Sequence, residues 1–128
     1  MKHFITLDKA KKMTALYRKE KDNIVSEEHK EKKPFFLSET FDAEAFRLVV
    51  NKTECTGVRI YYGMDDELKV HSIIVGVNEK DEDILPETGA SVNILNTSTD
   101  PTDNGDTGII EEGVSCPPNC PPPSPLNV

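Results

Sequence analysis

Hydrophobic and polar positions follow two different periods along this chain, and each period predicts a different kind of element. Ala10, Tyr17 and Ile24 recur every seven positions, which is typical of one face of a helix. Thr6 is a suitable N-cap, because its side-chain oxygen can accept a hydrogen bond from a backbone N–H group of the first turn. We therefore expect a helix over residues 5–25, with its lysines in water.

A second, shorter helix is predicted over residues 41–51, in the stretch FDAEAFRLVVN. Asp42 is the expected N-cap, and Phe41 and Phe46 are spaced to form a hydrophobic staple around it. Phe46, Val49 and Val50 would then face the core. The charged stretch before this helix ends in Pro34, which stops helices, so residues 26–36 are predicted to be a linker.

Strand-like alternation begins after the second helix. GVRIYYG (57–63) and LKVHSIIVGV (68–77) are rich in β-branched and aromatic residues, and the short loop between them predicts an antiparallel hairpin. With Gly63 paired to Leu68, the face expected to form the core carries Val58, Ile60, Tyr62, His71, Ile73, Val75 and Val77. A turn over 78–83 leads to a third short strand, which Pro86 stops.

These elements predict an α+β fold: two helices packed on a small antiparallel β-meander, followed by a long irregular acidic and proline-rich tail. The expected domain covers residues 1–86, and the tail covers 87–128. Much of the tail is polar and rich in Gly, Thr and Asn, a composition that cannot offset its own ordering entropy. The apolar stretch IIEEGV (109–114) is the exception, and two possibilities stay open: it docks on the sheet edge, or the whole tail is free.

Charge is distributed unevenly along the 128 residues. The net charge is −8, yet residues 1–33 hold ten basic against six acidic residues, and no basic residue follows Lys80. An acidic chain lacks the basic footprint of nucleic-acid binding proteins. No stretch approaches the roughly 20 apolar residues that span a bilayer, and the lysine-rich start does not resemble a secretory signal. We expect a cytoplasmic protein that binds neither nucleic acid nor membrane.

The tail cysteines Cys116 and Cys120 form a C-x3-C pair, a spacing that occurs in half of a zinc site. They are weak metal candidates, because a structural zinc site needs four ligands and no second pair exists. Cys55 and the histidines His3, His29 and His71 are scattered along the chain, and of these Cys55 or His71 is the candidate to complete the site. They also differ from the C-x-x-C redox motif, and prolines on both sides disfavour the helix that lowers a thiol pKa. A disulfide between them is sterically possible but would be reduced in a cytosol. No metal or other cofactor is expected.

Catalytic motifs are missing from the sequence. There is no glycine-rich phosphate loop, no G-x-S-x-G and no H-E-x-x-H. The stretch DPTDNGDTG, with Glu111 beyond it, matches a calcium loop only in part, because its acids are out of step with the ligand positions. We therefore expect a protein that is not an enzyme.

Four stretches of the chain, ITLDKA, GVRIYYG, VGVNEKDEDIL and CPPNCPPPSPL, together resemble a group of short bacterial proteins to which no function is assigned. The resemblance covers most of the predicted domain and the tail, and the tail is its most specific part. It implies a bacterial cytoplasmic protein and supplies no activity, cofactor or catalytic residue.

Interaction with a protein partner is the function that the sequence favours. Proline-rich segments lose little entropy on binding and dock into aromatic grooves. The expected partner-binding residues are Pro117, Pro118, Pro121, Pro122, Pro123, Pro125 and Leu126. The alternatives are a small zinc-binding protein that uses the tail cysteines and an acidic immunity-type inhibitor that masks a basic partner surface.

Overall fold

The computed structural model describes residues 2–86 and 108–128, and its chain forms two compact units. The first unit comprises Met1–Glu39, Met64–Val70 and Val114–Val128, and the second comprises Thr40–Gly63 and His71–Gly113. Helices and antiparallel strands are both present, so the predicted α+β class is confirmed. Among the described residues, no helix is long and apolar enough to cross a membrane.

The first unit begins with helix α1 (Leu7–Glu20), which is shorter than predicted. The Thr6 hydroxyl caps it as expected, accepting a hydrogen bond from the Lys9 backbone N–H at 3.1 Å. At the other end, the Asn23 side-chain amide donates to the Lys19 carbonyl at 3.2 Å. This bond satisfies a carbonyl that a longer helix would have paired itself, and so it helps to end the helix near Glu20.

The predicted linker over 26–36 contains a short 3₁₀ helix, η1 (Glu27–Lys32). An ion pair of 3.1 Å joins Lys30 to Glu27 one turn away. Lys33 ends the helix in the left-handed conformation, with φ of 46°. This stretch is thus regular in part, although it is too polar for its hydrophobic pattern to predict a helix.

A small two-stranded sheet completes the first unit. It pairs β1 (Ser38–Thr40) with β6 (Val114–Cys116), although these strands lie more than seventy positions apart in the sequence. The Leu37 backbone N–H donates to the Cys116 carbonyl at 2.7 Å beside this pair. The far C-terminal segment is thus tied by backbone hydrogen bonds to the segment that follows η1.

Helix α2 (Ala43–Val50) opens the second unit, and the sequence predicted its local details well. The Asp42 carboxylate accepts a hydrogen bond from the Glu44 backbone N–H at 3.1 Å. Phe41 and Phe46 pack edge to face with ring centroids 6.0 Å apart, as in the predicted hydrophobic staple. Of the residues expected to face the core, Val49 is buried, whereas Val50 is exposed.

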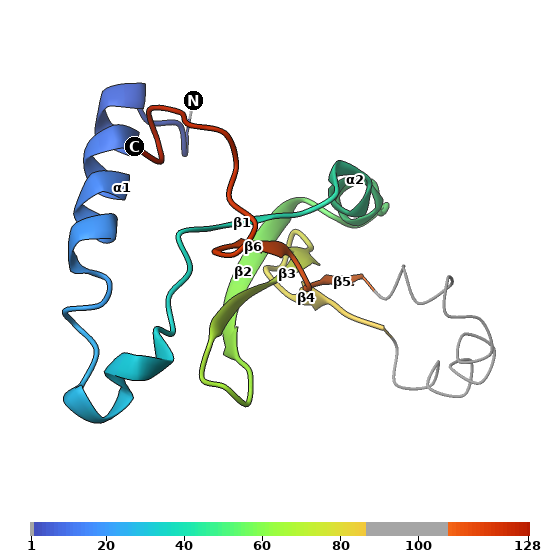
Figure 1. The fold of residues 1–128 in the computed structure, drawn as a ribbon. Coiled ribbons are helices and arrows are strands. Elements are labelled where there is room, and N and C mark those ends of the chain that lie inside the picture. The colour runs from blue at the N-terminus through green and yellow to red at the C-terminus, as the bar shows by residue number, and fades with distance from the viewer. Residues whose placement is uncertain (1, 87–107) are drawn as a thin grey trace. The chain divides into compact units, whose positions relative to one another are not determined.

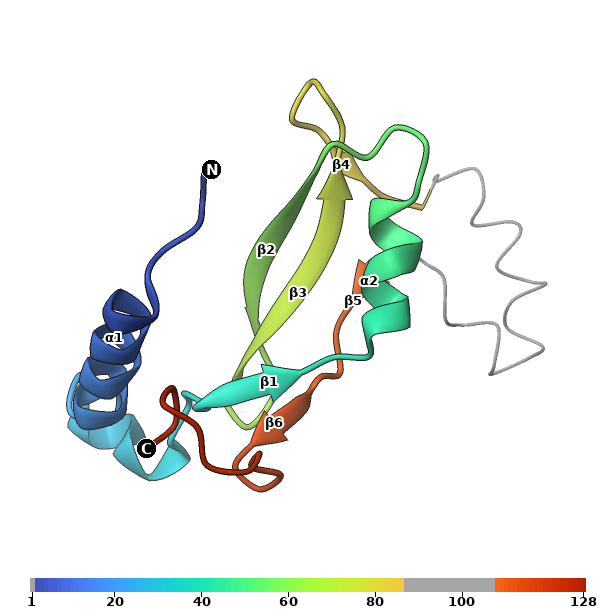
Figure 2. The ribbon, with the colours of Figure 1, turned by 90° about the horizontal axis from the view of Figure 1, so that it is seen from above.

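The second unit also holds the main sheet, in which the strand order β2-β3-β4 is that of a meander. Its strands are β2 (Gly57–Met64), β3 (Val70–Val77), β4 (Asp83–Ile84) and β5 (Ile109–Ile110). β4 pairs with β3 at Val77 and Gly76, and β5 pairs with the next two residues, Val75 and Ile74. Two short strands from distant parts of the sequence therefore share one edge of β3, and Figure 2 shows both beside it.

The core of this unit lies between α2 and the sheet, where Val49, Ile74 and Ile110 are buried together. The predicted core face was wrong for β2, because Val58, Ile60 and Tyr62 are 42%, 50% and 77% exposed. The physical reason is the place of each strand. β2 is an edge strand with half-exposed side chains, whereas β3 has partners on both edges and is buried from Ile74 to Val77.

Candidate functional site

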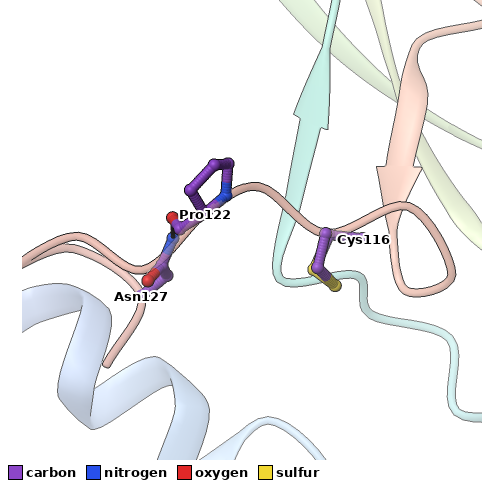
Figure 3. Close-up of a disulfide and its surroundings, with 4 residues drawn as sticks. Cys116, Pro122 and Asn127 are labelled. Carbon is purple, nitrogen blue, oxygen red and sulfur yellow. Dashed lines mark hydrogen bonds between the residues drawn. A yellow bond between two sulfur atoms is a disulfide. The ribbon is translucent and has the colours of Figure 1, made fainter.

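The C-terminal segment of the first unit carries every residue that the sequence assigned to partner binding. It starts at Cys116, the last residue of β6, which forms a disulfide with Cys120. The two Cα atoms are 4.5 Å apart. Because the cysteines are four positions apart, the bridge closes a loop with only three residues between them. Figure 3 shows this bridge at the end of the strand. The predicted metal candidates are therefore joined to each other.

The loop between the cysteines is held at its base as well as by the bridge. The Asn119 backbone N–H donates to the Ser115 carbonyl at 3.0 Å. The peptide bonds before Pro117 and Pro118 are both cis. Both prolines are exposed, so the loop presents two pyrrolidine rings to solvent.

A second turn shapes the last residues of the chain. The Asn127 side chain accepts a hydrogen bond from the Ser124 backbone N–H at 2.8 Å. It also donates one to the Pro122 carbonyl at 3.0 Å, and Figure 3 shows Asn127 and Pro122 side by side. The Ser124 hydroxyl in turn accepts from the Leu126 backbone N–H at 3.2 Å. These are the side-chain-to-backbone bonds that favour turns over extended structure.

Arg18 of α1 holds the end of this segment. Its guanidinium donates to the Leu126 carbonyl at 2.8 Å and to the Val128 carbonyl at 3.0 Å. Figure 1 shows the C-terminal end beside α1 accordingly. A planar guanidinium can donate to two acceptors in fixed directions, which a lysine ammonium does less well. The hydrophobic pattern predicted neither this role nor that of Asn127.

All seven predicted partner-binding residues, from Pro117 to Leu126, are exposed in this segment. Their backbone is nevertheless fixed at three points: the bridge at Cys116, the Asn127 turn and the Arg18 contact. We call these seven residues the proline surface. It combines exposed apolar side chains with a backbone that is held at these three points.

An apolar pocket of about 370 Å³ is a separate feature of the first unit. Its lining residues are Ile24, Val25, Ser26, His29, Lys32, Pro34, Phe35, Met64 and Leu68. Within it, the Ser26 hydroxyl and His29 Nδ1 are 3.0 Å apart. The Lys69 ammonium donates to the Lys32 and Lys33 carbonyls, which ties the hairpin loop to η1. Pockets of this size and lining accept an apolar group.

The second unit carries a polar cluster of Arg59, Tyr61, Asp81 and Asp83 that sequence reasoning did not identify. The Arg59 guanidinium is 2.6 Å from a carboxylate oxygen of each aspartate. The Tyr61 hydroxyl donates to Asp83 at 2.5 Å, which lowers the pKa of Asp83 and raises the pKa of Tyr61. The cluster joins β2 to β4 and the turn before it, so every member has a structural role.

Three other residues that the sequence offered as metal ligands or charged groups, Cys55, His71 and Asp65, each have a partner in the structure. Cys55 donates to the Gly57 carbonyl at 3.2 Å, and His71 Nδ1 lies 3.6 Å from a Glu111 oxygen. Asp65 caps the hairpin loop by accepting from the Glu67 and Lys69 backbone N–H groups. The partial calcium motif over 100–108 lies almost entirely outside the described residues.

Comparison with known proteins adds no assignment. No protein-family model, no curated protein sequence and no solved structure matches this chain.

Proposed function

We propose that this chain is a non-enzymatic bacterial interaction protein that binds a protein partner through the proline surface. In this proposal the acidic and proline-rich tail is the functional part of the fold, and the α+β region is its support. The observation that carries the proposal is the exposure of all seven residues on a backbone held by Cys116, Asn127 and Arg18.

Preorganisation is the physical argument for this function. A flexible ligand loses conformational entropy when it binds, and a segment that is already ordered avoids most of that loss. Proline rings also bury apolar area while adding no flexible side chain of their own. The expected partner site is lined by aromatic side chains that pack on proline rings, as in the grooves that bind extended polyproline helices.

The zinc alternative is disfavoured by the bridge between Cys116 and Cys120. Zinc binds thiolates, and a disulfide sulfur has no thiolate form until it is reduced. Within residues 2–86 and 108–128, no specific contact or surface favours the immunity-type alternative. Protein binding through the proline surface is accordingly the function that we infer.

Site-specific photo-crosslinking in a cell extract without added reductant tests the proposal. A photoreactive amino acid at Pro122 should give a discrete adduct with one partner, whereas the same amino acid at Thr53, an exposed position in the second unit, should not. The partner would be identified from the adduct by mass spectrometry and then purified. Adducts from Thr53 but none from Pro122 would contradict the proposal.

Calorimetric titration of the purified partner provides the quantitative step. Replacing Pro122 and Pro123 together by alanine should raise the Kd at least tenfold, which corresponds to about 1.4 kcal/mol. The matched control is Val58→Ala, which removes a half-exposed apolar side chain from the second unit and should leave the Kd unchanged. An unchanged Kd in the proline variant would show that the partner binds elsewhere.

A further inference from the structure

The two cysteines of the disulfide differ in their surroundings. Cys116 is 3% exposed and ends β6, and its carbonyl accepts the hydrogen bond from Leu37 at 2.7 Å. Cys120 is exposed and lies in the loop, followed directly by the prolines at 121–123. One sulfur therefore belongs to a buried strand residue, and the other to a residue that solvent reaches.

This difference decides where a thiol can attack. Exchange requires a thiolate to approach one sulfur of the bridge, with the other sulfur leaving. Only the Cys120 side is accessible from solvent. We propose that the Cys116–Cys120 disulfide is a thiol–disulfide exchange site, at which a low-molecular-weight thiol attacks Cys120 Sγ and Cys116 is the leaving thiolate.

The chemistry balances with the small thiol as the reductant. In the first step the attacking thiolate forms a new S–S bond to Cys120, and the electron pair of the broken bond goes to Cys116 Sγ, which takes a proton from water. A second thiolate can then attack the mixed disulfide at the sulfur of the small thiol, so that Cys120 leaves and is protonated. Two small thiols are then oxidised to one disulfide, and the protein disulfide is reduced by two electrons.

The surrounding contacts allow the bridge to open and close without loss of the local fold. Cys116 is held by the pairing of β6 with β1, which does not involve the bridge. Beyond Cys120, the Asn127 turn and the Arg18 contact hold the chain. In the mixed disulfide, the Cys116 thiol therefore remains close to Cys120, and this high effective concentration favours reclosure with release of the small thiol.

The size of the loop also fits an exchange site better than a structural staple. A disulfide stabilises a fold chiefly by restricting the unfolded chain, and this effect grows with the length of the loop that it closes. Here the cysteines are only four positions apart. Exposed disulfides are, moreover, the ones that undergo exchange most readily. The proposal stands on these features alone and does not require that the proline surface binds a partner.

The direct test uses the full native chain with its disulfide intact. The protein is incubated with a small excess of reduced glutathione, quenched with acid, and digested for peptide mapping by mass spectrometry. Glutathione should be found on Cys120 at least tenfold more often than on Cys116. Glutathione mainly on Cys116, or equally on both, would overturn the proposal, as would a bridge that reacts only after the protein is denatured.

Single-cysteine variants give an independent measurement. They are made in a Cys55→Ser background, so that the free thiol of Cys55 does not react in place of the tail cysteine. Cys120 in the Cys116→Ser variant should react with oxidised glutathione at least tenfold faster than Cys116 in the Cys120→Ser variant. The retained mixed disulfide is read by intact mass. Equal rates in two folded variants, checked by circular dichroism, would contradict the proposal. If either variant fails to fold, the glutathione map of the native chain decides.

Discussion

The two units of this protein are stabilised in different ways. In the second unit, α2, β3 and β5 contribute Val49, Ile74 and Ile110 to one apolar cluster. In the first unit, Pro34 and Cys116 are the buried residues among those described, and α1 has none. Its links include a disulfide, a backbone-paired strand, the Arg18 contact and the Lys69 hydrogen bonds to η1. Apolar burial supports the sheet unit, whereas covalent and polar links support the unit that displays the proline surface.

This contrast matters for function. A unit with a packed core resists local opening, whereas one held by a few discrete links can open where a link is broken. The proline surface and the exchange site both lie in the second kind of unit. Removal of one support should therefore affect the unit that contains it and leave the other unchanged.

The largest effect is expected in the core of the second unit. Ile74→Ala should lower the free energy of unfolding by about 2–5 kcal/mol, because it leaves a cavity against Val49 and Ile110. Ile60→Ala is the matched control, since Ile60 is half exposed on β2, and it should cost less than about 1 kcal/mol. Urea unfolding followed by circular dichroism measures both. Equal losses would mean that the β2 face also forms a core.

The short strand β5 should contribute almost as much stability as Ile74, although it lies more than thirty positions after β3 in the sequence. Ile110→Ala removes a buried side chain and should cost about 2–4 kcal/mol. Ile109→Ala changes the neighbouring, more exposed residue of the same strand and should cost much less. If the two variants lose the same stability, the register of Ile110 opposite Ile74 is wrong.

Loss of the disulfide should affect the first unit alone. Replacing Cys116 and Cys120 by serine should lower the free energy of unfolding by less than about 3 kcal/mol. That is the value for a disulfide that closes a loop of about fifteen residues, and this loop is far shorter. Amide exchange should accelerate at Leu37 and Asn119, whose hydrogen bonds lie beside the bridge. The amides of Ile74 and Val75 should be unaffected, and faster exchange there would show that the bridge supports both units.

Removing the Arg18 contact should have a smaller effect. Arg18→Gln loses the paired hydrogen bonds to the Leu126 and Val128 carbonyls, and we expect a cost of about 1 kcal/mol or less for an exposed contact. Hydrogen exchange at Leu126 and Asn127 should become faster. Lys19→Gln, on the same helix turn, is the control and should leave both amides unchanged.

The smallest effect concerns pH and the polar cluster of the second unit. The Tyr61 hydrogen bond lowers the pKa of Asp83, so its contribution is present above the ordinary pKa, near pH 4, and is lost as pH falls further. The pKa of Tyr61 is raised, so its contribution is present below about pH 10 and lost as pH rises through the higher value. Unfolding midpoints across pH should show both trends, and Tyr61→Phe should weaken both. A Tyr61→Phe profile identical to the native one would assign the trends to other groups.

The sequence alone identified the features that depend on near neighbours. Thr6 and Asp42 cap their helices as expected, because a capping side chain reaches backbone groups two or three residues away. The Phe41–Phe46 contact is local in the same way. The antiparallel β2-β3 hairpin was readable in outline, since its short loop and β-branched strands lie in one continuous stretch. Its expected register was wrong, because the Asp65 backbone N–H donates to the Lys69 carbonyl and Leu68 lies in the turn, not opposite Gly63. These local patterns were enough to assign the α+β class.

Tertiary structure decided which residues are buried and what the tail residues contact. Alternation of side chains along β2 could not reveal that Ile60 would be half exposed, because burial depends on which elements cover a strand. Ile110 lies opposite Ile74, and Arg18 meets the Leu126 carbonyl across more than a hundred positions. No local pattern encodes such pairings, since they form only when folding brings distant segments together.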